Sequence, residues 1–457
     1  MRLRRRVRLR HHRWVLTRAF ALVGAMVVIA PTVLFAQPAA DGRFEAAAAT
    51  AEYLASLSAD ARARSDAYFE GGYWIGLWRM LLTVAIMWLL LHTGLSRRMR
   101  EAAARLTRVR AFQVAVYWVM FFTLTTVVVL PWSAYTGYVR EHQYGLSTQT
   151  LGAWLGDEAK AFALGLAIGG VALMGLYRLL RTFTRTWWIW GAVFLIALQA
   201  AGATIFPVFV APIFNTYTRL EDPAIRDPIL RLARANGIHA TDVWQVDASR
   251  QTNRISANVS GMLGTERITL NDNLLARCSQ PCVEAVMGHE IGHYVLNHVY
   301  EMLLALGLVI VVSFAFAQWA FDRLRLRWPR WGVEGIGDPA GLPLLMLLLT
   351  LFTFTAFPVI NTIIRTNEQE ADVFGLNTAR QPDGFAEAAL RLAEYRKMEP
   401  STWEEYIFYD HPSGRTRIYT AMVWKQQMQK RAFRLRNSAR QARTPGSASA
   451  SAPLRSR

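Results

Sequence analysis

The sequence predicts a mainly helical protein that crosses a membrane several times and carries a small mixed α and β region outside the bilayer. Hydrophobic residues make up 53% of the 457-residue chain, which is high for a soluble protein of this length. Several stretches are apolar over the length that a helix needs to cross a bilayer. Residues 214–300 instead mix polar and apolar positions, and short runs there alternate as strands do.

The chain begins with a targeting or anchoring pattern over residues 1–36. A basic start precedes an apolar run at 19–35, and the small residues that follow resemble a cleavage site. A cleaved signal peptide and an uncleaved anchor helix both fit. In either case residues 37–72, expected to form a helical segment outside the bilayer, emerge on the far side of the membrane.

Six further apolar segments are long enough to span a bilayer. They lie at residues 73–95, 111–132, 161–180, 187–210, 301–321 and 342–364. They divide between two predicted membrane regions, 73–213 and 301–365. With the N-terminal segment, about seven transmembrane helices are expected.

The net charge of +18 comes from 51 basic and 33 acidic residues. The arginines gather in the short loops 96–110, 178–185 and 323–330, beside the apolar segments, which is typical of the positive-inside rule and not of nucleic-acid binding. These loops alternate with 37–72 and 134–157. The charge pattern therefore places residues 214–300 outside the cytoplasm.

The regions outside the membrane have patterns of their own. Residues 244–247 and 267–270 read as strands, with a possible edge strand at 256–262. Residues 366–424 are polar enough to be soluble and helical in pattern, and the basic tail at 425–457 is expected to be disordered. The two cysteines, Cys278 and Cys282, fit either one local disulfide or two free thiols.

The pentapeptide His289-Glu290-Ile291-Gly292-His293 carries the strongest chemical signal. Two histidines four positions apart share one face of a helix, and the glutamate beside them can reach a metal-bound water. In such HExxH sites zinc polarises the water and the glutamate takes its proton. Pro281 suits the first turn of this helix. Two surface histidines on an amphipathic helix are the alternative interpretation.

A third protein ligand is needed to complete such a site while leaving one position for water. Glu368 and Asp372 follow the last apolar segment and are four positions apart. One can bind the metal while the other accepts a hydrogen bond from a ligand imidazole. Glu370 lies off their shared face and is expected to be solvated. An acidic helix start without a metal is a common alternative.

These motifs resemble the integral-membrane CaaX prenyl protease family, HExxH zinc metallopeptidases of the gluzincin type, as a bacterial-type member. The bacterial heat-shock membrane protease is similar more distantly. The resemblance covers residues 50–420. Its motifs are Pro212-Ile213-Phe214-Asn215, Ser256-Ala257-Asn258 with Gly261, residues 267–270, Asn297-His298 after the HExxH helix, Glu368 with Ala371-Asp372, and His411-Pro412-Ser413 with Arg415 and Arg417.

The resemblance implies a role for each matching residue. His289, His293 and Glu368 bind one zinc ion, Glu290 is the general base and later the proton donor, Asp372 hydrogen-bonds a ligand imidazole, Asn258 binds the substrate backbone, and His411 and Arg417 stabilise the oxyanion. The implied fold is a ring of seven helices around a water-filled chamber, capped by a zincin-like α+β catalytic domain.

The predicted function is that of an integral-membrane zinc metalloendopeptidase acting on membrane-associated proteins or peptides. Its partners are a protein or peptide substrate and the lipid bilayer, and no nucleic acid. Loop charges and the Arg- and Trp-rich composition favour a bacterial inner membrane with the catalytic domain in the periplasm. The alternative is a zinc-stabilised membrane scaffold or chaperone without turnover, although a structural site has no use for Glu290.

Overall fold

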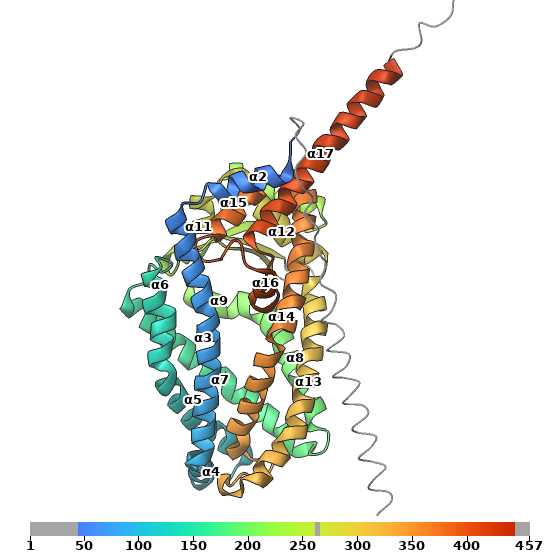
Figure 1. Ribbon diagram of the computed structural model, residues 1–457. Coiled ribbons are helices and arrows are strands. Elements are labelled where there is room, and N and C mark those ends of the chain that lie inside the picture. The colour runs from blue at the N-terminus through green and yellow to red at the C-terminus, as the bar shows by residue number, and fades with distance from the viewer. Residues whose placement is uncertain (1–43, 261–265, 444–457) are drawn as a thin grey trace, which may run out of the picture. The chain divides into compact units, whose positions relative to one another are not determined.

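The computed structural model describes residues 44–260 and 266–443, and helices dominate it (Figure 1). The predicted signal or anchor segment at residues 1–36 lies outside the described residues. The helices are α2 (Ala46–Ala55), α3 (Ala59–His92), α4 (Leu95–Leu106), α5 (Arg110–Ala134), α6 (Arg140–Gln143), α7 (Leu151–Thr182), α8 (Trp187–Ile205), α9 (Ala211–Phe214), α10 (Pro223–Ala235), α11 (Asp272–Arg277), α12 (Gln280–Val295), α13 (His298–Arg327), α14 (Leu342–Ala379), α15 (Pro382–Leu392), α16 (Thr402–Phe408) and α17 (Gly414–Arg443). The strands are β1 (Tyr217–Arg219), β2 (Val243–Val246), β3 (Ala257–Ser260) and β4 (Arg267–Asn271).

Six helical stretches of the described chain are long and apolar enough to cross a membrane: Ala59–His92, Arg110–Gln143, Leu151–Thr182, Trp187–Phe214, His298–Arg327 and Pro339–Ala379. Five of these helical stretches contain one of the apolar segments predicted from the sequence, and Ala59–His92 contains residues 73–92 of the segment predicted at 73–95. Most helix ends lie outside the predicted segments because caps, not hydrophobicity, set them. Ser58 starts α3 by accepting a hydrogen bond from the Ala61 amide at 3.1 Å, so the boundary predicted after residue 72 falls inside one helix.

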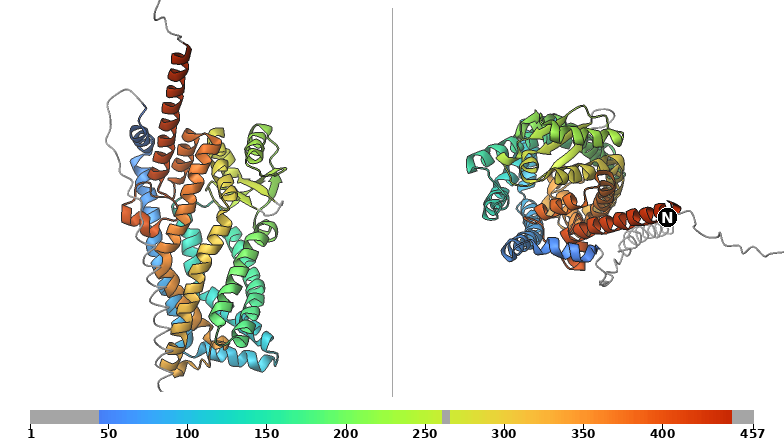
Figure 2. Two further views of the ribbon diagram at one scale, coloured as in Figure 1. Left: turned by 90° about the vertical axis from the view of Figure 1, so that its right-hand side faces the viewer. Right: turned by 90° about the horizontal axis from the view of Figure 1, so that it is seen from above.

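Three of the long helices, α3, α7 and α14, bury residues toward their ends and none in their middle turns. No residue is buried between Ser65 and Ile86 in α3, between Trp154 and Gly170 in α7, or between Leu348 and Asn361 in α14. A helix in a solid bundle buries one face along its whole length. Seen from above, the helices follow one another around the periphery (Figure 2). Middle turns without a buried face are what helices surrounding a chamber require.

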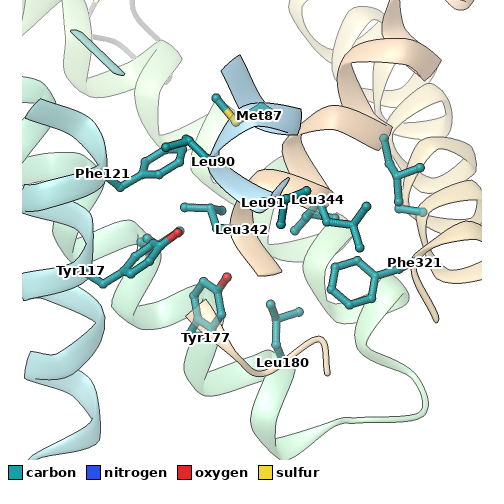
Figure 3. Packing of buried hydrophobic residues seen from close by; sticks show 14 of the residues in the cluster. Met87, Leu90, Leu91, Tyr117, Phe121, Tyr177, Leu180, Phe321, Leu342 and Leu344 are labelled. Carbon is teal, nitrogen blue, oxygen red and sulfur yellow. The ribbon is translucent and has the colours of Figure 1, made fainter. Parts of the chain in front are cut away.

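The end of the bundle at α4 is closed by a dense apolar core. Tyr117 and Phe121 of α5 pack there with side chains from α3, α7, α13 and α14 (Figure 3). The Ser96 hydroxyl of α4 links α5 to the turn before α14. It lies 2.8 Å from the Tyr117 hydroxyl and donates a hydrogen bond to the Ala340 carbonyl at 2.8 Å. A cavity at this end is lined by three arginines, Arg100 of α4, Arg110 of α5 and Arg181 of α7. The arginine-rich loops therefore gather away from α12, the helix that carries the HExxH motif (Figure 1).

A four-stranded sheet of order β1-β2-β4-β3 forms with α10 and α12 the compact region outside the bundle. β2 and β4 are parallel, and the outer strands β1 and β3 pair antiparallel to them. The three predicted strands are confirmed, with β3 at an edge as expected, while β1 was not predicted. α2 shares a second core with α15 and α17, which ties the start of the described chain to its end.

α12 and α14 approach each other closely because small residues face one another across their contact. A Cβ built on Gly375 of α14 would lie 2.8 Å from the His289 backbone nitrogen, and one on Gly288 would lie 3.0 Å from the Gly375 carbonyl oxygen. A Cβ built on Gly292 of α12 would lie 3.2 Å from the Ala371 carbonyl oxygen. This contact, called the glycine seam below, is formed by Gly288, Gly292 and Gly375, and its backbone-to-backbone packing leaves no room for larger side chains.

Two predictions about local structure are resolved. Cys278 and Cys282 are joined by a disulfide across the start of α12, with their Cα atoms 5.5 Å apart. The expectation of disorder from residue 425 is wrong for residues 425–443, because α17 runs without a break from Gly414 to Arg443. Its first turns are anchored by buried Ile418, Ala421 and Met422, from which the helix continues. The rest of the predicted tail lies outside the described residues.

Replacing Gly375 by alanine is expected to lower the thermal unfolding temperature of the detergent-solubilised protein. The new methyl group must push against the α12 backbone, and such overpacking costs about 1–3 kcal/mol. Gly76 of α3 is the matched control, since a Cβ there meets nothing within 4 Å. Gly76→Ala should leave the temperature unchanged or raise it, because alanine favours the helix. Equal stability of the Gly375→Ala variant and the wild type would contradict the close contact.

Candidate metal centre

Three potential ligand side chains from α12 and α14 converge in one place. His289 Nε2 and His293 Nε2 lie 3.1 Å apart. Glu368 Oε2 is 3.3 Å from His289 Nε2, and Glu368 Oε1 is 3.4 Å from His293 Nε2. The four-residue spacing places the two imidazoles on one face of α12, and the glycine seam brings the carboxylate of α14 against them.

These separations fit a tetrahedral metal ion. Ligand atoms at about 2.0–2.1 Å from a tetrahedral zinc stand about 3.3–3.4 Å from one another. Glu368 Oε2 is also a buried oxygen without a hydrogen-bond partner among the described residues. A buried polar atom of this kind is costly unless something binds it. The donor set of two imidazoles and one carboxylate therefore suits such an ion in both spacing and chemistry.

Asp372 orients the His289 imidazole through the ring nitrogen that faces away from the other potential ligands. Its Nδ1 lies 2.8 Å from Asp372 Oδ1, so it donates its proton to that carboxylate and keeps the Nε2 lone pair for a metal. Arg417 of α17 forms an ion pair with the same carboxylate. Burial opposes the charged imidazole, but the nearby Asp372 and Glu368 carboxylates outweigh it and raise the pKa of His289 to about 9. Metal binding at Nε2 must therefore displace a proton.

Glu290 lines the same cavity as His289 and Glu368. Burial raises the pKa of Glu290 above its ordinary value, while the neighbouring His289 and His293 oppose the shift. A raised pKa suits a carboxylate that accepts a proton from water and later returns it.

His411 approaches the ligands from the segment between α16 and α17. Its Nε2 lies 3.2 Å from Glu368 Oε2, and its Nδ1 lies 2.8 Å from Asp410 Oδ1. Burial lowers the pKa of His411, although the hydrogen bond that its Nδ1 donates to Asp410 acts in the opposite direction. Of the two arginines that follow, Arg417 lines the cavity, whereas Arg415 is half exposed and pairs with Glu399 at 3.1 Å.

The cavity at this centre has a volume of about 280 Å³ and two kinds of wall. The polar wall is formed by Ser256, His289, Glu290, Glu368, Tyr395, Arg396, His411 and Arg417. The apolar wall consists of Ile255, Ala257, Leu274, Val286, Phe385, Ala388, Ala389 and Leu392. Asn258 stands apart from this lining, exposed on the edge strand β3.

Two residues of the site were not predicted. Asp410 holds His411 as described, and the Nη2 atom of Arg396 lies 3.3 Å from His411 Nδ1. Asp410 could have been suspected, because it directly precedes His411 in the sequence. Arg396 lies in an irregular segment after α15, where no periodicity points to a function.

Family models and known proteins resemble this chain over most of its length. Residues 219–425 match the model of peptidase family M48, and residues 45–216 match that of the CAAX prenyl protease N-terminal region, described as five membrane helices. The uncharacterized metalloprotease YhfN of Bacillus subtilis is 28% identical over 339 residues, covering 74% of this chain and 79% of that protein. CAAX prenyl protease 1 of Saccharomyces cerevisiae is 34% identical over 183 residues, 40% of each protein.

A solved structure shows the same fold. The crystal structure of S. mikatae Ste24p matches with a TM-score of 0.69 over 82% of this chain and 94% of that chain, at 22% sequence identity. The predicted fold class, a mainly helical membrane protein with a chamber and a small sheet, is therefore confirmed. Between residues 45 and 425 the two family models leave out only residues 217 and 218. The region that carries the candidate site, residues 219–425, matches peptidase family M48, and the chain is an integral-membrane metalloendopeptidase.

Proposed function

We propose that the protein is a zinc-dependent endopeptidase that cleaves membrane-associated proteins or peptides, with Glu290 as its general base. The convergence of His289, His293 and Glu368 beside Glu290 carries this proposal. Zinc is the metal best suited to two imidazoles, one carboxylate and an open fourth position. When bound, it polarises water and the carbonyl of the scissile peptide bond.

The protein's own groups divide the remaining work. Glu290 accepts the proton of the attacking water and passes it to the departing amine. His411, held by Asp410, and Arg417 are assigned to the oxyanion of the cleaved bond. In support, Arg417 Nε is a buried donor without a hydrogen-bond partner among the described residues, while the same guanidinium is fixed by Asp372. That nitrogen is available to a substrate oxygen.

The edge strand β3 supports a mode of substrate binding. Its outer side is unpaired within the described sheet, and Ala257 of this strand lines the cavity beside the proposed metal. An extended peptide can add to such an edge through main-chain hydrogen bonds, with the exposed Asn258 contacting the peptide backbone. The apolar wall of the cavity suits a hydrophobic side chain next to the scissile bond.

The arginines at one end of the helix bundle support an orientation of the protein in the membrane. The arginine-rich loops gather at the α4 end, where Arg100, Arg110 and Arg181 share a cavity. The positive-inside rule assigns that end to the cytoplasm. The proposed catalytic centre, residues 214–300 with 366–424, then faces the periplasm of a bacterial inner membrane, where the Cys278–Cys282 disulfide is stable.

Purified protein stripped with a chelator and reloaded is expected to bind one zinc ion per chain. Glu368→Ala removes a ligand and should weaken binding by more than the about 10–100-fold that loss of an outer hydrogen bond costs. His239→Ala is the control, because His239 is exposed on the loop before β2. Metal competition titrations measure the affinities. Unchanged zinc affinity in Glu368→Ala would refute the ligand assignment.

Glu290→Gln is expected to retain zinc and to lose peptide cleavage by about 10²–10⁴-fold, the typical contribution of a general base. Glu284→Gln changes the same side-chain type on the same helix, away from the proposed ligands, where Glu284 accepts hydrogen bonds from Gln280 and Gln381. It should cleave a fluorogenic peptide library like the wild type. Full activity of Glu290→Gln would rule out this base. Zinc binding without cleavage by the wild type would favour the scaffold alternative.

A reporter that is active only in the periplasm, fused to the C-terminus of the full chain, is expected to be active in a bacterial host. α17 lies on the same side as the proposed metal centre, because its Arg417 pairs with Asp372, and the loop charges assign that side to the periplasm. A reporter active only in the cytoplasm should be inactive at the same position. The opposite pair of results would reverse the assigned orientation and with it the set of accessible substrates.

A further inference from the structure

His298 lies against the back of a proposed metal ligand. Asn297 ends the turn after α12 with a positive φ of 62°, and His298 begins α13. This turn returns the buried His298 ring toward α12, so that its Nδ1 lies 2.9 Å from His293 Nδ1. Neither a packing role nor a solvent-facing role accounts for two ring nitrogens at hydrogen-bond distance.

The position of the protons follows from the metal centre, and this argument rests on the proposed function. His293 Nε2 is a corner of the ligand triangle, so its lone pair must point to the metal. The His293 proton then sits on Nδ1 and is donated to His298 Nδ1. His298, as a neutral ring that accepts at Nδ1, carries its own proton on Nε2.

The Nε2 proton of His298 needs an acceptor, and Glu370 stands nearest to providing it. His298 Nε2 is buried and has no hydrogen-bond partner among the described residues. Glu370 Oε2 lies 3.5 Å away, and the Glu370 side chain is 55% exposed and free to turn. A shift of a few tenths of an ångström completes the bond, whose length is normally below about 3.2 Å. We propose that Glu370 and His298 form a hydrogen-bonded relay that positions His293 as a metal ligand.

The relay gives the two ligand imidazoles equivalent support from different elements. Asp372 accepts directly from His289 and is itself held by Arg417. His298 accepts from His293 and is held by Glu370 in the same way. Hydrogen bonds of this kind fix the tautomer and the orientation of a ligand ring. Three acidic side chains of α14 thus act on the proposed metal. Glu368 binds it directly, Asp372 acts through His289, and Glu370 acts through His298 and His293.

A second metal ion is the competing interpretation of the same residues. His298, Glu301 and Glu370 place potential ligand atoms within 4.8 Å of one another. However, a neutral imidazole has one lone pair, and that of His298 is already used by His293. A metal at His298 Nε2 would require the loss of the His293–His298 hydrogen bond. The geometry therefore favours the relay, and Glu301 distinguishes the two interpretations.

The experiment measures zinc affinity by chelator competition in the full-length, detergent-solubilised protein. His298→Phe keeps a flat ring but removes the acceptor, and Glu370→Ala removes the end of the relay. Zinc affinity should fall about 10–100-fold in His298→Phe, and also in Glu370→Ala, where the buried Nε2 loses its acceptor. His298→Gln, whose side-chain amide again offers an acceptor, should recover part of the affinity. Glu301→Ala is the matched acidic control and should bind like the wild type.

The outcomes separate the relay from its competitor and from the proposed function. Wild-type zinc affinity in both His298→Phe and Glu370→Ala, with an active wild-type enzyme, overturns the relay alone. Two zinc ions per wild-type chain, with one lost in Glu301→Ala, establishes the second metal site and overturns the relay. An active wild type that binds no zinc overturns the proposed function itself. Because the Glu370 side chain is more than half exposed, Glu370→Ala decides the question even where His298→Phe fails to fold.

Discussion

The close contact between α12 and α14 is the feature on which the rest of the site depends. α12 contributes both imidazoles and the proposed base, and α14 contributes Glu368, the proposed third ligand, and Asp372. These side chains meet only because Gly288, Gly292 and Gly375 allow the two backbones to touch. A tetrahedral site tolerates shifts of a few tenths of an ångström, so one methyl group in the seam is enough to separate the ligands.

The same contact links the proposed chemistry to the membrane. α14 is one of the six membrane-length helices, and its polar end carries the site. α12 passes through the Asn297 turn into α13, another of these helices. α17 packs against the same centre through the ion pair between Arg417 and Asp372. The centre is therefore built at the ends of helices that surround the chamber, where a substrate held in or near the bilayer can reach it.

Part of the candidate site could be predicted from regular spacing, because positions four apart share a helix face, as in the pairs His289 with His293 and Glu368 with Asp372. The choice of Glu368 as the third ligand and the roles of His411 and Arg417 came from the resemblance to the CaaX prenyl protease family. The same spacing puts Glu370 off the metal face, but its reach toward His298 depends on the turn at Asn297. Arg396 lies in an irregular segment, where tertiary contacts alone decide its position. The six spans were predicted from hydrophobicity, yet their ends were not, because caps such as Ser58 set them. Beyond residue 425 the polar composition suggested disorder, whereas a helix already anchored in the core continues through such residues.

X-ray absorption at the zinc edge of the reloaded, full-length protein tests the central claim most directly. The account predicts one zinc ion with two imidazole nitrogens and oxygen ligands at about 2.0–2.2 Å, and no sulfur in its shell. Sulfur ligands at about 2.3 Å would place the metal at Cys278 and Cys282 instead of between α12 and α14. Such a spectrum, or one without imidazole scattering, would contradict the metal centre described above.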